Sequence, residues 1–314
     1  RMEIIELSGY TNEEKFNIAK KHLVPKQAKL HGLNGRTFKI NDKALYALID
    51  GYTREAGVRK LEQKIAALCR KAAAEIVGGE SKSLTVKEAN LEKLLGPKKY
   101  LPLSVDKEAE IGVVNGLAWT SVGGEMLQVE SAVFDGTGKV ELTGSLGDVM
   151  KESAMAAVSF IRSKADKYGV NHNFYKEKDI HIHVPEGAVP KDGPSAGVTM
   201  ATALLSALTN TPVNQFVAMT GEISLRGRVL PIGGLREKTM AAYRMGIKTV
   251  IIPQKNVPDL SEIDEKVRAA LNFVPVTELD EVFEIALVTP KEEKERKSIA
   301  AVAQKESGYT AMRI

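Results

Sequence analysis

The chain has 314 residues, of which 43% are hydrophobic and 27% charged, proportions typical of a globular protein with about two domains. Its single cysteine, Cys69, excludes an internal disulfide framework and favours a reducing compartment. No apolar run approaches the ~20 residues that span a bilayer, and the start lacks the pattern of an export signal, so we expect a cytoplasmic protein without a membrane partner.

Residues 1–97 are predicted to form a small, mainly helical domain. Thr11 and Glu14 have the spacing of a capping box, which predicts a helix from there to about residue 23, ending near Pro25. Further helices are expected at 43–49 and 58–77, where apolar residues recur at helical spacing. Short β-prone pieces lie at 38–40 and 84–86.

The turn-rich stretch 98–104 is the predicted linker, and a larger second domain at 105–288 follows it. Strands are expected first, at 111–120, 126–134 and 139–142, and then a helix at 148–168. After it, strands (180–184, 216–219, 228–231, 249–252) alternate with helices (195–208, 235–245 and two short ones ending near 287). This order predicts a mixed α/β or α+β fold. The charged tail, 289–314, is expected to be disordered.

Residues 190–197 (PKDGPSAG) place Ser195 at the predicted start of a helix. Free amides and the helix dipole at that end favour a developing negative charge. A serine there is therefore a candidate nucleophile with oxyanion donors close by. The alternative is a serine that only caps its helix.

A nucleophilic serine needs a base, and the sequence offers two kinds. His181 and His183 share one face of a predicted strand, but no third ligand at a familiar spacing completes a metal site, so no metal is expected. Lys238 lies on a predicted helix with Ala and Met neighbours. If it is buried, desolvation lowers its pKa and lets it act as a base; the alternative is a solvated helix lysine.

Two longer segments, 190–197 and 221–238 (GEISLRGRVLPIGGLREK), closely resemble signature sequences of the bacterial Lon protease family. Residues 116–120 (GLAWT) and 181–187 (HIHVPEG) resemble it as well, and the resemblance extends over nearly all of 1–287. It implies a Lon-type α/β (α+β) protease domain, preceded by the small helical lid subdomain of an AAA+ ATPase module.

The resemblance also assigns roles to individual residues. It implies a catalytic dyad of Ser195 and Lys238 in place of a Ser–His–Asp triad. Thr220 would be the threonine that helps to hold the lysine, and Asp192 the acid that shapes the active-site loop. Residues 53–59 (TREAGVR) match the motif whose last arginine contacts nucleotide phosphate, which makes Arg59 the expected sensor.

The family implies ATP-dependent degradation of unfolded, damaged and short-lived regulatory proteins by homohexameric rings. The sequence contains no G-x-x-x-x-G-K-[ST] motif, so this chain is not expected to hydrolyse ATP alone. ATP and Mg²⁺ are therefore expected as cofactors of the intact enzyme and not of this fragment, whose expected substrates are peptides and unfolded chains.

The sequence leaves two other functions open. Residues 1–100 contain 20 Lys and Arg against 12 Asp and Glu, which suits a non-catalytic adaptor that docks DNA or an ATPase partner; binding that weakens steeply with salt would support it. The other is a chaperone-like piece with a latent dyad. Reactivity of Ser195 toward a boronate inhibitor would separate a latent dyad from an active one.

Overall fold

The first helix begins at the predicted capping box. In the computed structural model, which describes residues 9–100, 108–120, 123–185 and 191–288, the Thr11 hydroxyl accepts from the Glu14 amide, and the Glu14 carboxylate accepts from the Thr11 amide. α1 (Asn12–Ile18) follows. The reciprocal cap satisfies two amides that have no partner within the helix.

The helix does not end near Pro25, and this part of the prediction is wrong. α1 runs through a π-helical segment, η1 (Ala19–Leu23), into α2 (Val24–Leu30), with Pro25 in the first turn of α2. A proline inside a helix lacks the N–H donor and crowds the carbonyl four residues before it. The wider π turns just before Pro25 provide a local departure from α geometry, so the chain passes the proline without leaving the helix.

Three more helices and a two-stranded sheet complete the first unit. They are α3 (Asp42–Tyr52), α4 (Arg59–Val77), α5 (Glu88–Leu95), β1 (Phe38–Ile40) and β2 (Leu84–Val86). β1 and β2 are parallel, with Phe38 opposite Leu84. The predicted apolar face of α4 is confirmed, because Leu61, Ile65, Leu68 and Ala72 are fully buried. α5 was not predicted, since it is short and buries only Leu91 and Leu94, with Leu95 partly buried against the same core.

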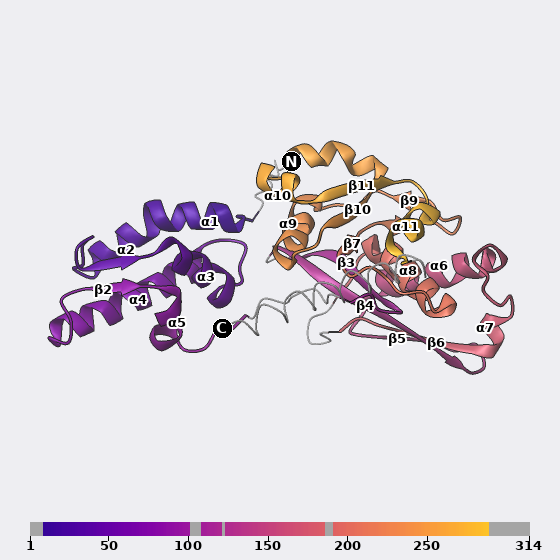
Figure 1. Cartoon of the computed structure of the whole chain (residues 1–314), viewed down its shortest axis with the longest axis horizontal. Helices are drawn as coiled ribbons and strands as arrows, with labels where there is room; N and C mark the ends of the chain where they lie inside the picture. The colour runs from indigo at the N-terminus through magenta and orange to yellow at the C-terminus, as the bar shows by residue number, and fades with distance from the viewer. Residues whose placement is uncertain (1–8, 101–107, 121–122, 186–190, 289–314) are drawn as a thin grey trace, which may run out of the picture. The chain divides into compact units, whose positions relative to one another are not determined.

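A seven-stranded mixed sheet is the centre of the second unit (Figure 1). Its order is β11-β10-β7-β3-β4-β6-β5. The strands are β3 (Val113–Thr120), β4 (Gly123–Asp135), β5 (Val140–Thr143), β6 (Lys178–His183), β7 (Val217–Met219), β10 (Thr249–Pro253) and β11 (Asn272–Val276). β7 is parallel to both β3 and β10, whereas β4 and β6 are antiparallel. The mixed α/β prediction is confirmed.

The helices of this unit are α6 (Asp148–Ser163), α7 (Phe174–Glu177), α8 (Gly197–Thr209), α9 (Leu235–Met245), α10 (Glu265–Ala270) and α11 (Leu279–Ala286), with 3₁₀ turns η2 (Ala165–Tyr168), η3 (Pro194–Ala196) and η4 (Gln254–Glu262). A hairpin, β8 (Glu222–Ile223) and β9 (Val229–Leu230), stands apart from the main sheet. The single helix predicted at 148–168 is thus α6 followed by η2.

Alternate residues of the central strands enter two separate cores. Met219 of β7 and Ile251 of β10 pack with α6, α8 and α11. Ala218 and Val250, their neighbours in sequence, pack with α9 and α10 on the opposite face. This alternation is what a strand buried on both faces requires. Strand β11 was not predicted, and its Pro275 is tolerated because β11 is an edge strand.

The chain divides into two compact units: the first comprises residues 1–103 with the short segment 120–123, and the second comprises 104–119 and 124–314. The predicted tail and residues 101–104 of the predicted linker lie outside the described residues. Among the helices that the structure describes, none combines the length and the apolar character needed to cross a membrane.

The Glu55 carboxylate caps α4 and generates a prediction for the first unit. Its two oxygens accept from the amides of Lys60 and Leu61, each at 2.8 Å. Glu55→Ala should speed hydrogen exchange across α4 several-fold, the equivalent of ~1 kcal/mol for a lost cap. Mass spectrometry of peptides from 59–77 measures this. The control is Glu75→Ala in the same helix, and equal exchange in both variants would contradict the cap.

Candidate active site

Ser195 lies in the 3₁₀ turn η3, directly before α8. The turn is entered through Gly193, whose φ of +127° is strained for any residue with a side chain. Ser195 is half-buried. Its carbonyl accepts from the Gly221 amide at 2.9 Å, and the Val198 amide donates to the Gly221 carbonyl at 3.1 Å. The serine is therefore fixed by its backbone to the segment that joins β7 to β8.

Lys238 is a buried lysine on α9, with 3% of its surface exposed. Its Nζ donates to the Thr220 hydroxyl at 3.1 Å. Burial removes the ammonium from water and lowers the pKa of Lys238 from 10.5 to about 8. Part of the Lys238 population therefore carries a neutral amine with a free lone pair near neutral pH. The sequence analysis predicted this for a lysine that is buried.

Thr220 joins the serine to the lysine. It follows β7, is 1% exposed, and its hydroxyl donates to the Ser195 carbonyl at 3.5 Å. Because a hydroxyl has one hydrogen, the same oxygen meets Lys238 as an acceptor. Within the described chain no hydrogen bond joins Lys238 Nζ directly to Ser195 Oγ. Such contacts are often long without substrate, and the structure nevertheless brings all three predicted residues into one connected group.

The start of β4 packs closely against the backbone of α9 at Glu237 and Lys238, a feature that the sequence analysis missed. A Cβ at Gly124 would lie 1.7 Å from the Glu237 carbonyl oxygen, so the strand crosses the backbone of α9 at van der Waals distance. Arg244, on the last turn of α9, donates to the Gly124 carbonyl at 2.8 Å. The available signal was the Gly123-Gly124 pair, which lies between the strands predicted at 111–120 and 126–134 but belongs to β4, since glycines in a strand can mark a close backbone approach.

Asp192 anchors the segment that leads to Ser195. Its carboxylate accepts from the Met150 amide at 3.1 Å, in the first turn of α6, and from the Gly193 amide at 2.9 Å. The neighbouring Lys191 pairs with the α6 entry, since the Gly147 amide donates to its carbonyl at 2.7 Å. A carboxylate at a helix N-terminus is stabilised by the free amides there. The contacts suit the loop-shaping role predicted for Asp192.

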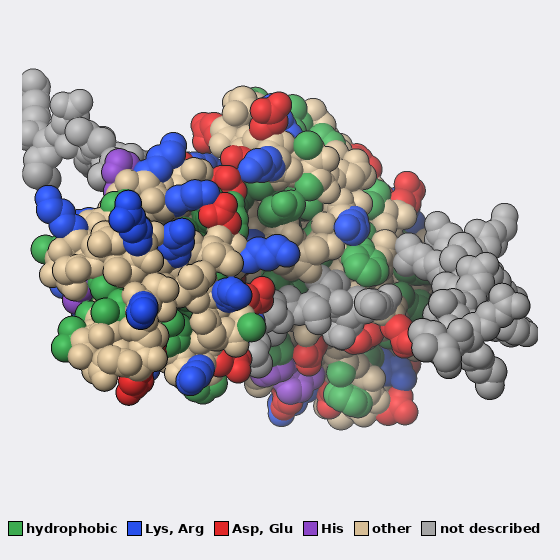
Figure 2. Space-filling model, turned by 60° about the vertical axis from the view of Figure 1, so that its left-hand side comes forward, with side chains coloured by type: hydrophobic (Ala, Val, Ile, Leu, Met, Phe, Trp, Pro, Cys, Tyr) green, Lys and Arg blue, Asp and Glu red, His purple; other side chains and the backbone are tan. Residues whose placement is uncertain are grey.

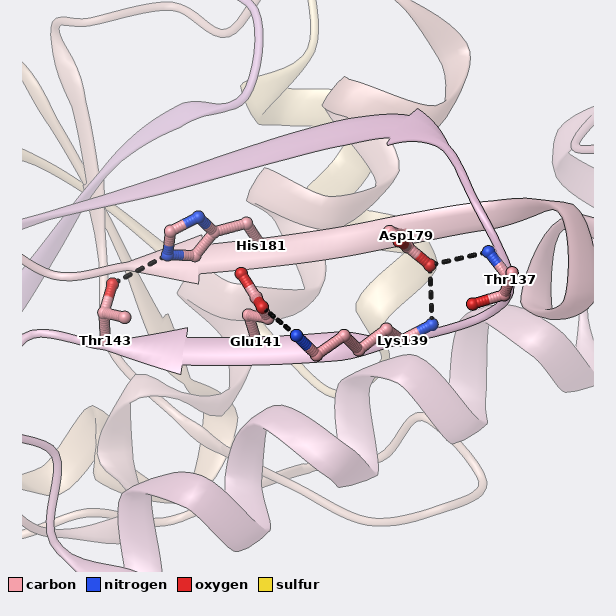
Figure 3. A network of polar contacts seen from close by, with 6 residues as sticks. All are labelled: Thr137, Lys139, Glu141, Thr143, Asp179 and His181. Carbon is pink, nitrogen blue, oxygen red and sulfur yellow. Dashed lines mark hydrogen bonds and ion pairs between the residues drawn. The ribbon is translucent and has the colours of Figure 1, made fainter.

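The remaining candidates lie elsewhere. His181 and His183 both contact the Thr143 hydroxyl on the β5–β6 face (Figure 3 draws His181), and the described residues hold no group of three or more metal-binding side chains. Arg59 is exposed at the start of α4, in the first unit. A nucleotide-sensing role for Arg59 stays a prediction.

Comparison with known proteins identifies two domains of one family. Residues 85–289 match the Lon protease (S16) C-terminal proteolytic domain, and residues 29–85 match the Lon protease AAA+ ATPase lid domain. The helical first unit is thus a lid domain, and the unit with the seven-stranded sheet is a serine protease domain of this type.

Individual relatives agree with the domain matches. The Lon protease of Clostridium acetobutylicum is 54% identical over 289 residues, covering 92% of this chain. Those of Brevibacillus choshinensis and Vibrio parahaemolyticus are each 56% identical, covering 91% of this chain. The chain spans 37% of the length of each of these relatives.

The buried amine predicts an unusual dependence of stability on pH. In the unfolded chain Lys238 binds a proton below pH ~10.5, whereas in the folded protein it does so only below a pH of about 8. The resulting penalty is complete below pH 8 and vanishes as the pH rises toward 10.5. Lys238→Met should therefore raise the stability of the second unit by roughly 1–3 kcal/mol at pH 7 and by much less at pH 10.

Thermal unfolding followed by fluorescence of Trp119, the only tryptophan of the chain, measures this difference at the two pH values. Lys248→Met is the matched control, because Lys248 is exposed. A Lys238→Met advantage that is the same at pH 7 and pH 10 would show that the amine is not desolvated.

Proposed function

The chain belongs to the Lon protease family, and on that premise we propose that it is the peptide-cleaving part of an ATP-dependent protease, with Ser195 as nucleophile and Lys238 as general base. The buried amine of Lys238, with its pKa lowered to about 8, carries the proposal. A lysine at its ordinary pKa is protonated at neutral pH and cannot accept a proton. Desolvation lowers the pKa of Lys238, so that a fraction of its amine is neutral near physiological pH.

The proposed reaction proceeds through an acyl-enzyme. Ser195 Oγ attacks the peptide carbonyl carbon while neutral Lys238 takes the hydroxyl proton and becomes an ammonium. Lys238 gives this proton to the departing amine as the C–N bond breaks. Water then attacks the ester, Lys238 accepts its proton, and Ser195 Oγ takes the proton back when the acid leaves. Acylation and deacylation therefore each begin and end with neutral Lys238.

Thr220 aims the lysine in this scheme. Since its hydrogen is directed to the Ser195 carbonyl, its oxygen receives an N–H of Lys238. One N–H is thus held away from the serine, which orients the rest of the amine, including the lone pair. The same threonine touches the backbone of Ser195, so a single hydroxyl sets the position of base and nucleophile together.

Backbone amides around Ser195 are the proposed oxyanion donors. The amides of Gly197 and Val198 already donate to the Pro194 and Gly221 carbonyls. This leaves the amides of Ser195 and Ala196, at the start of the turn that leads into α8, as donors for a substrate oxygen. The dipole of α8 adds to their effect because its positive end faces the developing charge.

Substrates and partners follow from the family. We propose that the substrates are unfolded and damaged proteins, short-lived regulatory proteins and peptides. The intact enzyme is proposed to be a cytoplasmic homohexamer. ATP with Mg²⁺ would be bound by the whole ATPase module, with Arg59 as its sensor. DNA binding has weaker support: the Lys and Arg side chains are spaced among other residues over the visible face (Figure 2).

The dyad predicts both the loss of activity and its pH dependence. Ser195→Ala and Lys238→Met should each abolish hydrolysis of a fluorogenic peptide, by 10³-fold or more as an order of magnitude. In the unmutated chain kcat/KM should rise with pH to a plateau, with a midpoint of about 8, because only neutral Lys238 accepts the proton. Full activity in either variant, or a midpoint near 6.5 that indicates a histidine base, would overturn the dyad.

Thr220→Val tests the proposed positioning. Removing the hydroxyl should lower kcat by about tenfold, typical of one lost hydrogen bond, with little change in KM. The lost bond favoured the ammonium, so the midpoint of the pH profile should also move below that of the parent chain. Thr220→Ser keeps the hydroxyl and should keep both values. A lower kcat with an unmoved midpoint would mean that Thr220 is only structural.

A further inference from the structure

His181 and His183 form a pair that the proposed protease chemistry does not use. They alternate on β6 with Ile180 and Ile182, which are buried in the core. Both imidazoles therefore lie on the other face of the sheet, half-exposed. None of the described helices adds a core residue over this face at β5 and β6, because the second core lies against β3, β7 and β10. The pair is accessible from solvent.

Both rings point at one oxygen atom. His181 Nε2 lies 2.8 Å and His183 Nδ1 2.7 Å from the Thr143 hydroxyl oxygen on β5. A hydroxyl has one hydrogen, so it can donate to only one of the two nitrogens, and the other must bring its own N–H. Either nitrogen can instead present a lone pair by changing tautomer. His181 Nε2 and His183 Nδ1 therefore converge on the same point, and each can offer a lone pair to a ligand there.

We propose that His181 Nε2 and His183 Nδ1 bind one divalent transition-metal ion, of the zinc, nickel or copper class. Imidazole nitrogens prefer these ions over Mg²⁺ and Ca²⁺, which take oxygen ligands. The ion takes the position between the rings that the Thr143 hydroxyl now approaches. Water completes its coordination, as expected of an open site on a strand face.

Carboxylates flank the pair on both neighbouring strands. Strand register places Glu141 of β5 beside His181 and Glu130 of β4 opposite His183. Directly paired residues have side chains within reach of each other. Glu141 is turned toward Lys139, with which it forms an ion pair (Figure 3). These carboxylates do not converge with the imidazoles, so they act here by attracting the cation, with Glu141 available as a third ligand if it leaves Lys139.

The pair also adjoins the framework of the Ser195 loop. Thr143 ends β5, and two residues later the Ser145 carbonyl accepts from the Lys191 amide at 3.1 Å. Lys191 precedes Asp192, the anchor of that loop on α6. An ion held between β5 and β6 would restrain this end of the sheet. Any effect on cleavage rests on the proposed function, whereas binding itself does not.

Calorimetric titration of the whole chain with ZnCl₂ alone, in a buffer that does not chelate zinc, tests the site. We expect one saturable site, weakened at least tenfold by His181→Ala and by His183→Ala. His172→Ala is the matched control: its imidazole is exposed and lies 3.7 Å from the Asp166 carboxylate. Cys69 is buried and offers no competing thiol. Zinc should also slow hydrogen exchange at residues 140–147.

Equal melting temperatures of the variants in EDTA establish that the fold is intact. Ser195→Ala should bind zinc like the parent chain, so that failure of the dyad and failure of the metal site are read separately. The absence of a saturable site at sub-millimolar zinc overturns the proposal. So does a loss in His172→Ala as large as in the two β6 variants.

Discussion

The burial of one amine is the constraint around which the protease domain is organised. Lys238 is removed from water, and the shift of its pKa from 10.5 to about 8 corresponds to about 3 kcal/mol at neutral pH. The surrounding cores must offset this penalty. They do so on both faces of the sheet, where apolar side chains are fully buried. A solvated lysine would carry no such penalty, but it would remain protonated at neutral pH and could not accept a proton.

The sheet topology supplies the place for this amine. β7 lies between β3 and β10 and is parallel to both, so Thr220 emerges at the carboxyl end of a central strand. Ligand sites of open α/β sheets form at such ends. The Thr220 amide donates to the Ile251 carbonyl of β10 at 3.2 Å, which fixes the backbone of Thr220 to the sheet. α8 and α9 then bring serine and lysine from opposite faces of the sheet.

The sequence predicted those features that depend on neighbours in the chain. The helical spacing of α4 and the capping box of α1 are local, and both are confirmed. The passage of the helix through Pro25 was not foreseen, because the π segment before it has no sequence signature. The close approach of Gly124 to the backbone of α9 was not predicted, because the two segments are more than a hundred residues apart in sequence. Residue patterns alone left two interpretations open for each residue: Ser195 as a nucleophile or a helix cap, and Lys238 as a base or a solvated lysine.

A motif match cannot separate the residues that hold a site from those that act in it, whereas geometry can. In residues 53–59 the Thr53 hydroxyl donates to the Ile49 carbonyl, Glu55 caps α4, and Arg59 is exposed on its first turn. Only the last of these is free to reach a phosphate. In residues 190–197 Asp192 fixes the loop and Ser195 presents a hydroxyl. Both motifs therefore combine a residue proposed for chemistry with residues that anchor its backbone. Glu55 and Asp192 each satisfy amides at a helix N-terminus, whereas Thr53 satisfies a carbonyl near the end of α3.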